Sequence, residues 1–186
     1  MMQKRFKELL NSKVILDTNS ILDLHELEIL DLPTRIFTEV YISENILIEE
    51  INKEQVEKLL LLGYKPISLN TNNGLTLLSD LNKNNKSLSI PDRVVISIAH
   101  ENCIICCTND RAARNVCKSI NIEVIGTIGI LGCAYENAII ERKEFEYIFN
   151  KYCEEASSYI NNSLEIEVRA LYSIPKYKSG KLIRIQ

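Results

Sequence analysis

Two aspartates in this sequence each follow an apolar run that reads as a buried strand. Asp17 comes directly after "KVIL", and Asp110 ends the stretch "CIICCTND". In open parallel sheets, ligands gather at the carboxyl ends of the strands. Asp17 and Asp110 are therefore expected to share one crevice.

Further acids can reach the same crevice. Asp92 stands beside Pro91 at the start of a predicted helix, and Glu49 and Glu50 lie in the helical stretch "ILIEEI". Three or four carboxylates without a lysine among them repel one another unless a divalent cation neutralises them. Oxygen-only ligands suit Mg²⁺ or Mn²⁺. Each acid alone can equally be a helix N-cap or a solvated side chain. The metal-site hypothesis therefore rests on the acids occurring together.

The elements that would position these acids alternate along the chain. Apolar runs without polar alternation indicate strands buried on both faces, and amphipathic stretches lie between them. Strands are predicted at 13–16, 36–42, 65–69, 103–107 and 122–126. Helices are predicted at 20–30, with Ser20 as a possible N-cap, and at 44–51, 53–63, 74–82, 91–101, 111–120 and 128–139. This order predicts a three-layer α/β/α fold with a parallel central sheet.

Composition sets the broad class. The chain has 186 residues, 46% hydrophobic and 25% charged, with a formal net charge of −3. That profile is globular and gives no overall attraction to nucleic acid, so such contacts need a local basic patch. No apolar run approaches the roughly 20 residues that span a bilayer. The charged start "MMQKRFKELL" does not resemble a signal peptide, so we expect a cytoplasmic protein without membrane contact.

Other kinds of site are disfavoured. Cys103 and Cys106 have CxxC spacing, but both are predicted on one strand, where their side chains would point to opposite faces. The glycines of "GTIGILG" fit neither a dinucleotide nor a P-loop pattern, and close helix packing is the preferred interpretation. A phosphoacceptor receiver domain would need a lysine on a late strand, and "IEVIG" has none.

Four motifs in order resemble PIN-domain nucleases. They are "VILDTNSIL", "ILIEEI", "IPDRVVISIAHE" and "CIICCTNDRAAR", within residues 13–135. The later stretch "INIEVIGTIGILGCA" is similar to a poorly characterised PIN-like subgroup. The resemblance implies a nuclease domain over residues 1–140. Residues 141–186 are expected to form a helical extension and a basic tail packed on the same domain.

The resemblance implies roles for single residues. Asp17, Asp92 and Asp110 match the family's metal-binding acids. The helix acid is Glu50 if "LIEEI" is aligned on its apolar neighbours, which we prefer, and Glu49 if positions are counted from Ser43. Asn19 and Thr108 match polar positions that commonly assist the site in that family. Arg111 and Arg114 fall where a contact with substrate phosphate is expected, although surface salt bridges explain the two arginines equally well.

The implied activity is metal-dependent hydrolysis of RNA, with Mg²⁺ or Mn²⁺ as cofactor. Relatives of this kind include toxins of toxin–antitoxin pairs, so an antitoxin-like protein or regulator is an expected partner, and a homodimer is possible. The alternative is a PIN-fold binding module without activity. Residues 168–186 contain five basic residues and no acid. A hairpin turning at Ser179 and Gly180 is predicted there, either as a plain surface feature or as a site for RNA or a protein partner.

Overall fold

Five parallel strands form the centre of the molecule, in the order β3-β2-β1-β4-β5. The computed structural model describes residues 9–155, 162–178 and 181–183. The strands are β1 (Lys13–Leu16), β2 (Glu39–Ser43), β3 (Lys65–Ile67), β4 (Ile105–Cys107) and β5 (Val124–Ile125). Their carboxyl ends share one edge, as parallel pairing requires. The three-layer α/β/α prediction is confirmed.

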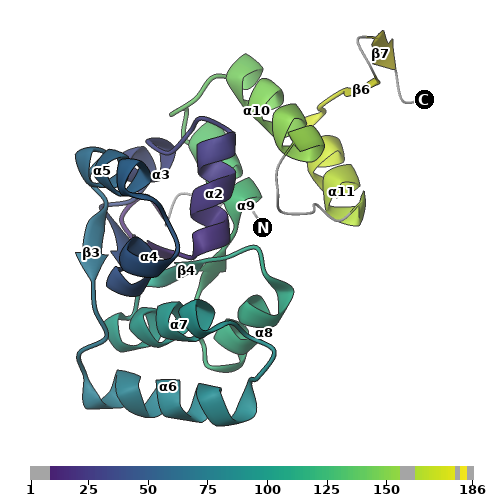
Figure 1. Cartoon of the computed structure of the whole chain (residues 1–186). Helices are drawn as coiled ribbons and strands as arrows, with labels where there is room; N and C mark the ends of the chain where they lie inside the picture. The colour runs from purple at the N-terminus through teal and green to yellow at the C-terminus, as the bar shows by residue number, and fades with distance from the viewer. Residues whose placement is uncertain (1–8, 156–161, 179–180, 184–186) are drawn as a thin grey trace.

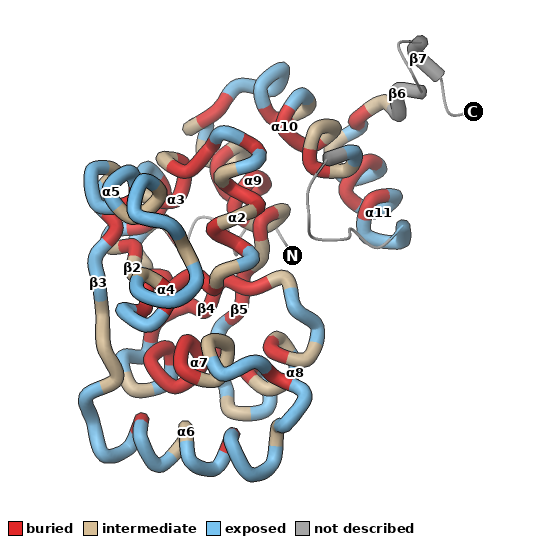
Figure 2. Tube along the Cα trace, in the orientation of Figure 1, coloured by how far each residue is buried: buried red, intermediate tan, exposed pale blue. Residues whose placement is uncertain are grey.

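Helices cover both faces of this sheet (Figure 1). One side holds α2 (Thr18–Glu26), α3 (Leu32–Ile36) and α9 (Thr127–Glu136). The other holds α7 (Ile90–Asn102) and α8 (Arg111–Ser119), with α6 (Asn72–Asn84) packed against α7. Two short helices, α4 (Glu44–Glu49) and α5 (Lys53–Leu61), connect β2 to β3. Figure 2 shows buried residues along the inner strands and in α2, α7 and α9, whereas β3 and α6 are mostly exposed.

Burial explains why the strand predictions succeeded. Val14, Ile15 and Leu16 of β1 are fully inaccessible, and Cys106 and Cys107 of β4 nearly so. A strand covered on both faces needs apolar side chains at every position, which is the pattern visible in the sequence.

Three local predictions were wrong. Asp17, not Ser20, is the N-cap of α2. The strand predicted from residue 36 begins at Glu39, because Ile36 ends the short helix α3. Cys103 lies outside β4: it ends α7 in the left-handed conformation, with φ of 52°. The strand-based argument against a shared Cys103–Cys106 zinc site therefore no longer applies.

Two further helices follow the sheet. Helix α10 (Arg142–Glu155) packs on α9, where Phe145 stacks on Tyr135 with 4.7 Å between ring centroids. In α11 (Asn162–Tyr172), the buried Arg169 donates to Glu165 Oε1 at 2.7 Å. Arg169 is thus a structural residue, and Ile174 beyond it is also buried.

The chain ends in a two-stranded antiparallel sheet. It pairs β6 (Lys176–Lys178) with β7 (Lys181–Ile183), as the predicted hairpin requires. The predicted turn residues, Ser179 and Gly180, lie outside the described residues. In the part of the chain that the structure describes, no helix is long and apolar enough to cross a membrane.

Candidate functional site

Asp17 is a buried carboxylate at the carboxyl end of the central strand β1. It is only 2% exposed, and its Oδ1 accepts a hydrogen bond from the Ser20 amide at 2.7 Å, which caps α2. Its Oδ2 is also buried, yet none of the described groups makes a hydrogen bond to it. Oδ1 of Asp17 therefore stabilises the fold as a helix cap, and Oδ2 has no structural partner among the described groups.

The surroundings of Asp17 disfavour its charge. Burial is the largest cause, and it raises the pKa of Asp17 from 3.8 to about 6. The Ser20 side chain and amide and the nearby Thr108 hydroxyl act in the opposite direction, and the charge of Asp92 raises the pKa further. Asp17 directly follows the central strand, and Asp92 lies at the start of α7, which packs against that strand. A cation between the two carboxylates would offset the cost of burying the Asp17 charge.

Asp92 reaches the edge from the first turn of α7. Its Oδ2 accepts hydrogen bonds from the Ser89 hydroxyl at 2.7 Å and the Ser89 amide at 3.2 Å, and its own amide donates to the Ser89 hydroxyl. This capping box fixes the side chain at the helix start. Asp92 is therefore held in place before any ligand binds.

The loop after β4 carries Thr108, Asn109 and Asp110. Asp110 caps α8 by accepting from the Ala113 amide at 2.7 Å, and its own amide donates to the Thr108 hydroxyl at 3.2 Å. Arg114 donates to the Thr108 carbonyl at 2.8 Å. This contact gives Arg114 a structural role in holding the strand end.

A buried polar network, which was not predicted from the sequence, supports this loop. Asp23 of α2 is fully inaccessible, and its Oδ2 accepts from Asn109 Nδ2 at 2.8 Å and from the Thr127 hydroxyl at 3.3 Å. Asn109 also accepts from the Thr127 amide at 3.1 Å. Asp23 is one of three acids in the predicted helix 20–30, and its spacing does not distinguish it from the solvated ones.

The position of the same loop leaves room only for a glycine at position 126. A Cβ added there would lie 2.5 Å from Asn109 Oδ1 and 3.1 Å from Arg114 Nη1. The preferred explanation for this glycine, close packing of a helix, is therefore replaced by close approach of the Asn109 side chain.

The other predicted site residues lie on the surface. Glu49 ends α4, Glu50 is its C-cap, and both are exposed, as are Asn19, Arg111 and Asp110. Among the described residues, no three His, Cys, Asp or Glu side chains lie close enough together to form a metal-binding group. Convergence of all four acids thus stays a prediction.

Three of the four unpartnered buried polar atoms of the described chain gather at this edge. They are Asp17 Oδ2, Thr18 Oγ1 and Ser43 Oγ, from residues at the carboxyl ends of β1 and β2. The fourth, Arg93 Nε, belongs to a guanidinium group that donates to Asn82 of α6 and to the Leu88 carbonyl. Because folded proteins normally satisfy buried polar groups, this concentration indicates an edge shaped for a polar ligand or cation.

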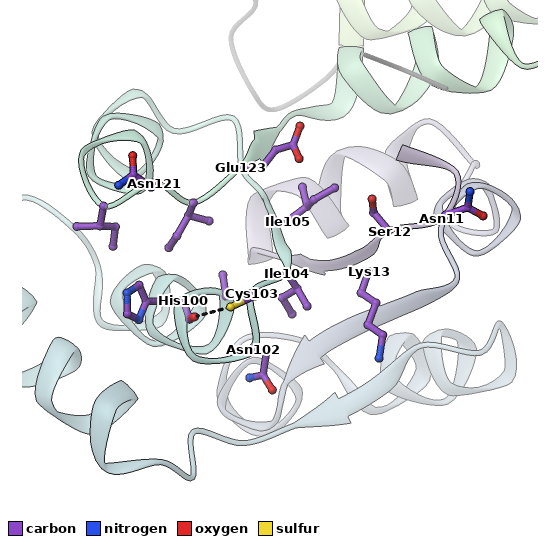
Figure 3. A pocket seen from close by; sticks show the side chains of 13 residues that line it. Asn11, Ser12, Lys13, His100, Asn102, Cys103, Ile104, Ile105, Asn121 and Glu123 are labelled. Carbon is purple, nitrogen blue, oxygen red and sulfur yellow. Dashed lines mark hydrogen bonds between the residues drawn. The ribbon is translucent and has the colours of Figure 1, made fainter. Parts of the chain in front are cut away.

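A separate cavity of about 620 Å³ lies at the opposite, amino edge of the sheet (Figure 3). Lys13, Cys103 and Glu123 are among its lining residues, and the Cys103 thiol contacts the His100 carbonyl at 3.9 Å. None of the predicted site residues lines it.

Comparison with family models agrees with the fold. A family model described as PIN domain matches residues 13–171. No curated protein matches the chain. Among solved structures, that of PAE2754 from Pyrobaculum aerophilum matches with a TM-score of 0.43 and 11% sequence identity, covering 67% of this chain and 98% of that chain.

Proposed function

Because this chain belongs to the PIN-domain family, we propose that it is a metal-dependent ribonuclease that hydrolyses phosphodiester bonds. The observation that carries the proposal is Asp17 Oδ2: a buried carboxylate oxygen without a partner, beside the charge of Asp92. A buried charge without a partner is costly, and a divalent cation is a partner that removes the cost.

The residues fit such a cation in type. Asp17, Asp92, Asp110 and Glu50, or Glu49 in its place, would supply oxygen ligands only, which suits Mg²⁺ or Mn²⁺. When bound, the cation would supply an activated water and neutralise charge on the leaving oxygen.

The protein's own contribution is positioning. The capping contacts of Asp17, Asp92 and Asp110 hold each carboxylate at a helix start before substrate arrives. Thr108 and Asn19 are proposed to orient the scissile phosphate. Arg111, exposed in the first turn of α8, is proposed to contact a neighbouring phosphate.

A cleavage assay on mixed RNAs tests this function. Purified protein is titrated with Mg²⁺ and Mn²⁺, with an EDTA arm and an Asp17→Asn control. We expect cleavage only with metal, and only background cleavage by Asp17→Asn. Cleavage that persists in EDTA or in Asp17→Asn would refute the proposed chemistry.

The biological role within this function is a further proposal. A ribonuclease of this family could act in the cytoplasm as the toxin of a toxin–antitoxin pair, held inactive by a small protein partner. Expression with and without the product of a neighbouring small reading frame tests this role: the partner should restore growth that the wild-type chain arrests, and Asp17→Asn should arrest nothing.

A further inference from the structure

We propose that Ser43 belongs to the same metal site, where its hydroxyl holds the water shell of the bound cation. This inference rests on the proposed function and adds a positioning residue on a strand that carries none of the predicted acids. The evidence for this role comes from the side chains that lie across from each other at the carboxyl ends of the paired strands β1 and β2.

The strand register places Ser43 beside Asp17. Strands β1 and β2 are parallel, with Lys13 opposite Glu39 and Leu16 opposite Ile42. The next matched positions are Asp17 and Ser43. Side chains at matched positions of neighbouring parallel strands point to the same face, and the ion pair between Lys13 and Glu39 shows this at the other end of the strands.

Helix α7 covers that face. It contacts β1, β2 and β4, and its first turn carries Asp92. Ser43 thus faces the space that Asp17 and Asp92 share.

The Ser43 hydroxyl has no structural role of its own. Ser43 is fully inaccessible, and its Oγ has no hydrogen-bond partner among the described residues. It stands at the N-cap position of α4, yet its side chain makes no capping hydrogen bond. The fold therefore buries a hydroxyl next to an equally unpartnered carboxylate oxygen, Asp17 Oδ2.

One ligand would satisfy both atoms. A carboxylate oxygen only accepts hydrogen bonds, whereas a hydroxyl both donates and accepts. A hydrated divalent cation presents a positive charge to Asp17 and water hydrogens and oxygens to Ser43. Mg²⁺ in particular retains several waters in protein sites, and groups that hold such outer ligands tune metal affinity.

Mn²⁺ binding by titration calorimetry and melting in EDTA test the inference. Ser43→Ala should weaken Mn²⁺ binding by about 10-fold. Its metal-free melting temperature should stay unchanged or rise, because the variant removes an unsatisfied buried hydroxyl. Ser43→Thr keeps the hydroxyl and should bind Mn²⁺ more tightly than Ser43→Ala.

Ser97→Ala is the matched control. Ser97 is an equally buried serine whose hydroxyl donates to the Arg93 carbonyl at 2.8 Å, so this variant should lower the melting temperature and leave Mn²⁺ affinity unchanged. Ser43→Ala that binds Mn²⁺ as tightly as wild type, or that melts lower without metal, would overturn the Ser43 role alone. Absence of Mn²⁺ binding in the wild-type chain would overturn the proposed function with it.

Discussion

At the scale of single residues, Asp17 combines a structural and a proposed chemical role. Its Oδ1 caps α2, and its Oδ2 is buried without a partner. An aspartate that follows a strand can be a helix cap or a site residue. Asp17 can be both, because one carboxylate oxygen caps the helix and the other is free for a ligand.

The raised pKa of Asp17 predicts a pH-dependent stability in the absence of metal. A pKa of about 6 in the folded chain, against an ordinary value of 3.8, corresponds to about 3 kcal/mol. The folded state holds this proton more tightly than the unfolded state, so the contribution of Asp17 to stability is fully present below about pH 4 and is lost as the pH rises through about 6.

Asp17→Asn should remove this dependence. The amide oxygen can still cap α2, so in EDTA the variant should be more stable than wild type by up to about 3 kcal/mol at neutral pH. Near pH 4 the difference in stability between Asp17→Asn and wild type should shrink to a small fraction of its value at neutral pH. Urea unfolding at both pH values measures it. A variant less stable than wild type at neutral pH would mean that the charged cap outweighs the cost of burial.

Gly126 offers a second prediction at this scale. Gly126→Ala would push its Cβ against Asn109 Oδ1 and should lower the free energy of unfolding by about 1–3 kcal/mol. In an Asn109→Ala background the added methyl has room, so the same change should cost much less. Equal costs in both backgrounds, measured by urea unfolding, would show that Asn109 is not the obstacle.

Some of the site could be predicted from residue types and some could not. Asp17 and Asp110 were recognisable because they end apolar runs, and Asp92 because it stands beside a proline at a helix start. Asp23 and Ser43 have no such signal: one is among three acids in a helical pattern, and the other appears as an ordinary helix cap. Their importance depends on which atoms lie next to them, which only the folded chain specifies.

At the scale of elements, the strand-end loop after β4 is held by contacts from two different helices. Thr127 at the start of α9 donates to Asp23 of α2 and accepts from Asn109 of the loop. The sequence predicted the strands and helices here because burial on both faces leaves a continuous apolar pattern. It missed α3, whose five residues are too few to display a helical period.

Thr127→Val tests this network with little change in shape. It removes the hydroxyl between Asp23 and Asn109 and should cost about 1–3 kcal/mol of stability. RNA cleavage should fall as well, because the loop that carries Thr108 and Asp110 loses support. Thr76→Val on exposed α6 is the control and should change stability by less than about 0.5 kcal/mol. A Thr127→Val chain as stable as wild type would contradict the network's role.

At the scale of the whole molecule, the C-terminal segment divides into a packed part and a tail. Val168, Arg169 and Ile174 are buried, so α11 and the residue pair after it belong to the fold. Not all five basic residues of segment 168–186 are free to bind a partner, since Arg169 is paired with Glu165.

Two truncations separate these parts. A chain that ends after Lys176 should melt at the wild-type temperature and keep its metal affinity, whereas one that ends after Ile166 should melt lower because it loses buried side chains. If the tail contacts RNA phosphates, the shorter tail should also flatten the salt dependence of RNA binding. Unchanged RNA affinity with loss of a co-purifying protein would assign the tail to a partner instead. A chain ending after Lys176 that fails to fold would refute both roles.

The most direct test of the account is the position of a bound metal. Crystals soaked in Mn²⁺ and measured at a wavelength where manganese scatters anomalously should show a peak at the carboxyl edge of the sheet, next to Asp17 Oδ2 and Asp92. The peak should be absent from Asp17→Asn crystals treated in the same way. A wild-type chain without such a peak, or with manganese only at the cavity on the amino edge, would contradict the proposal that Asp17 belongs to a metal-dependent nuclease site.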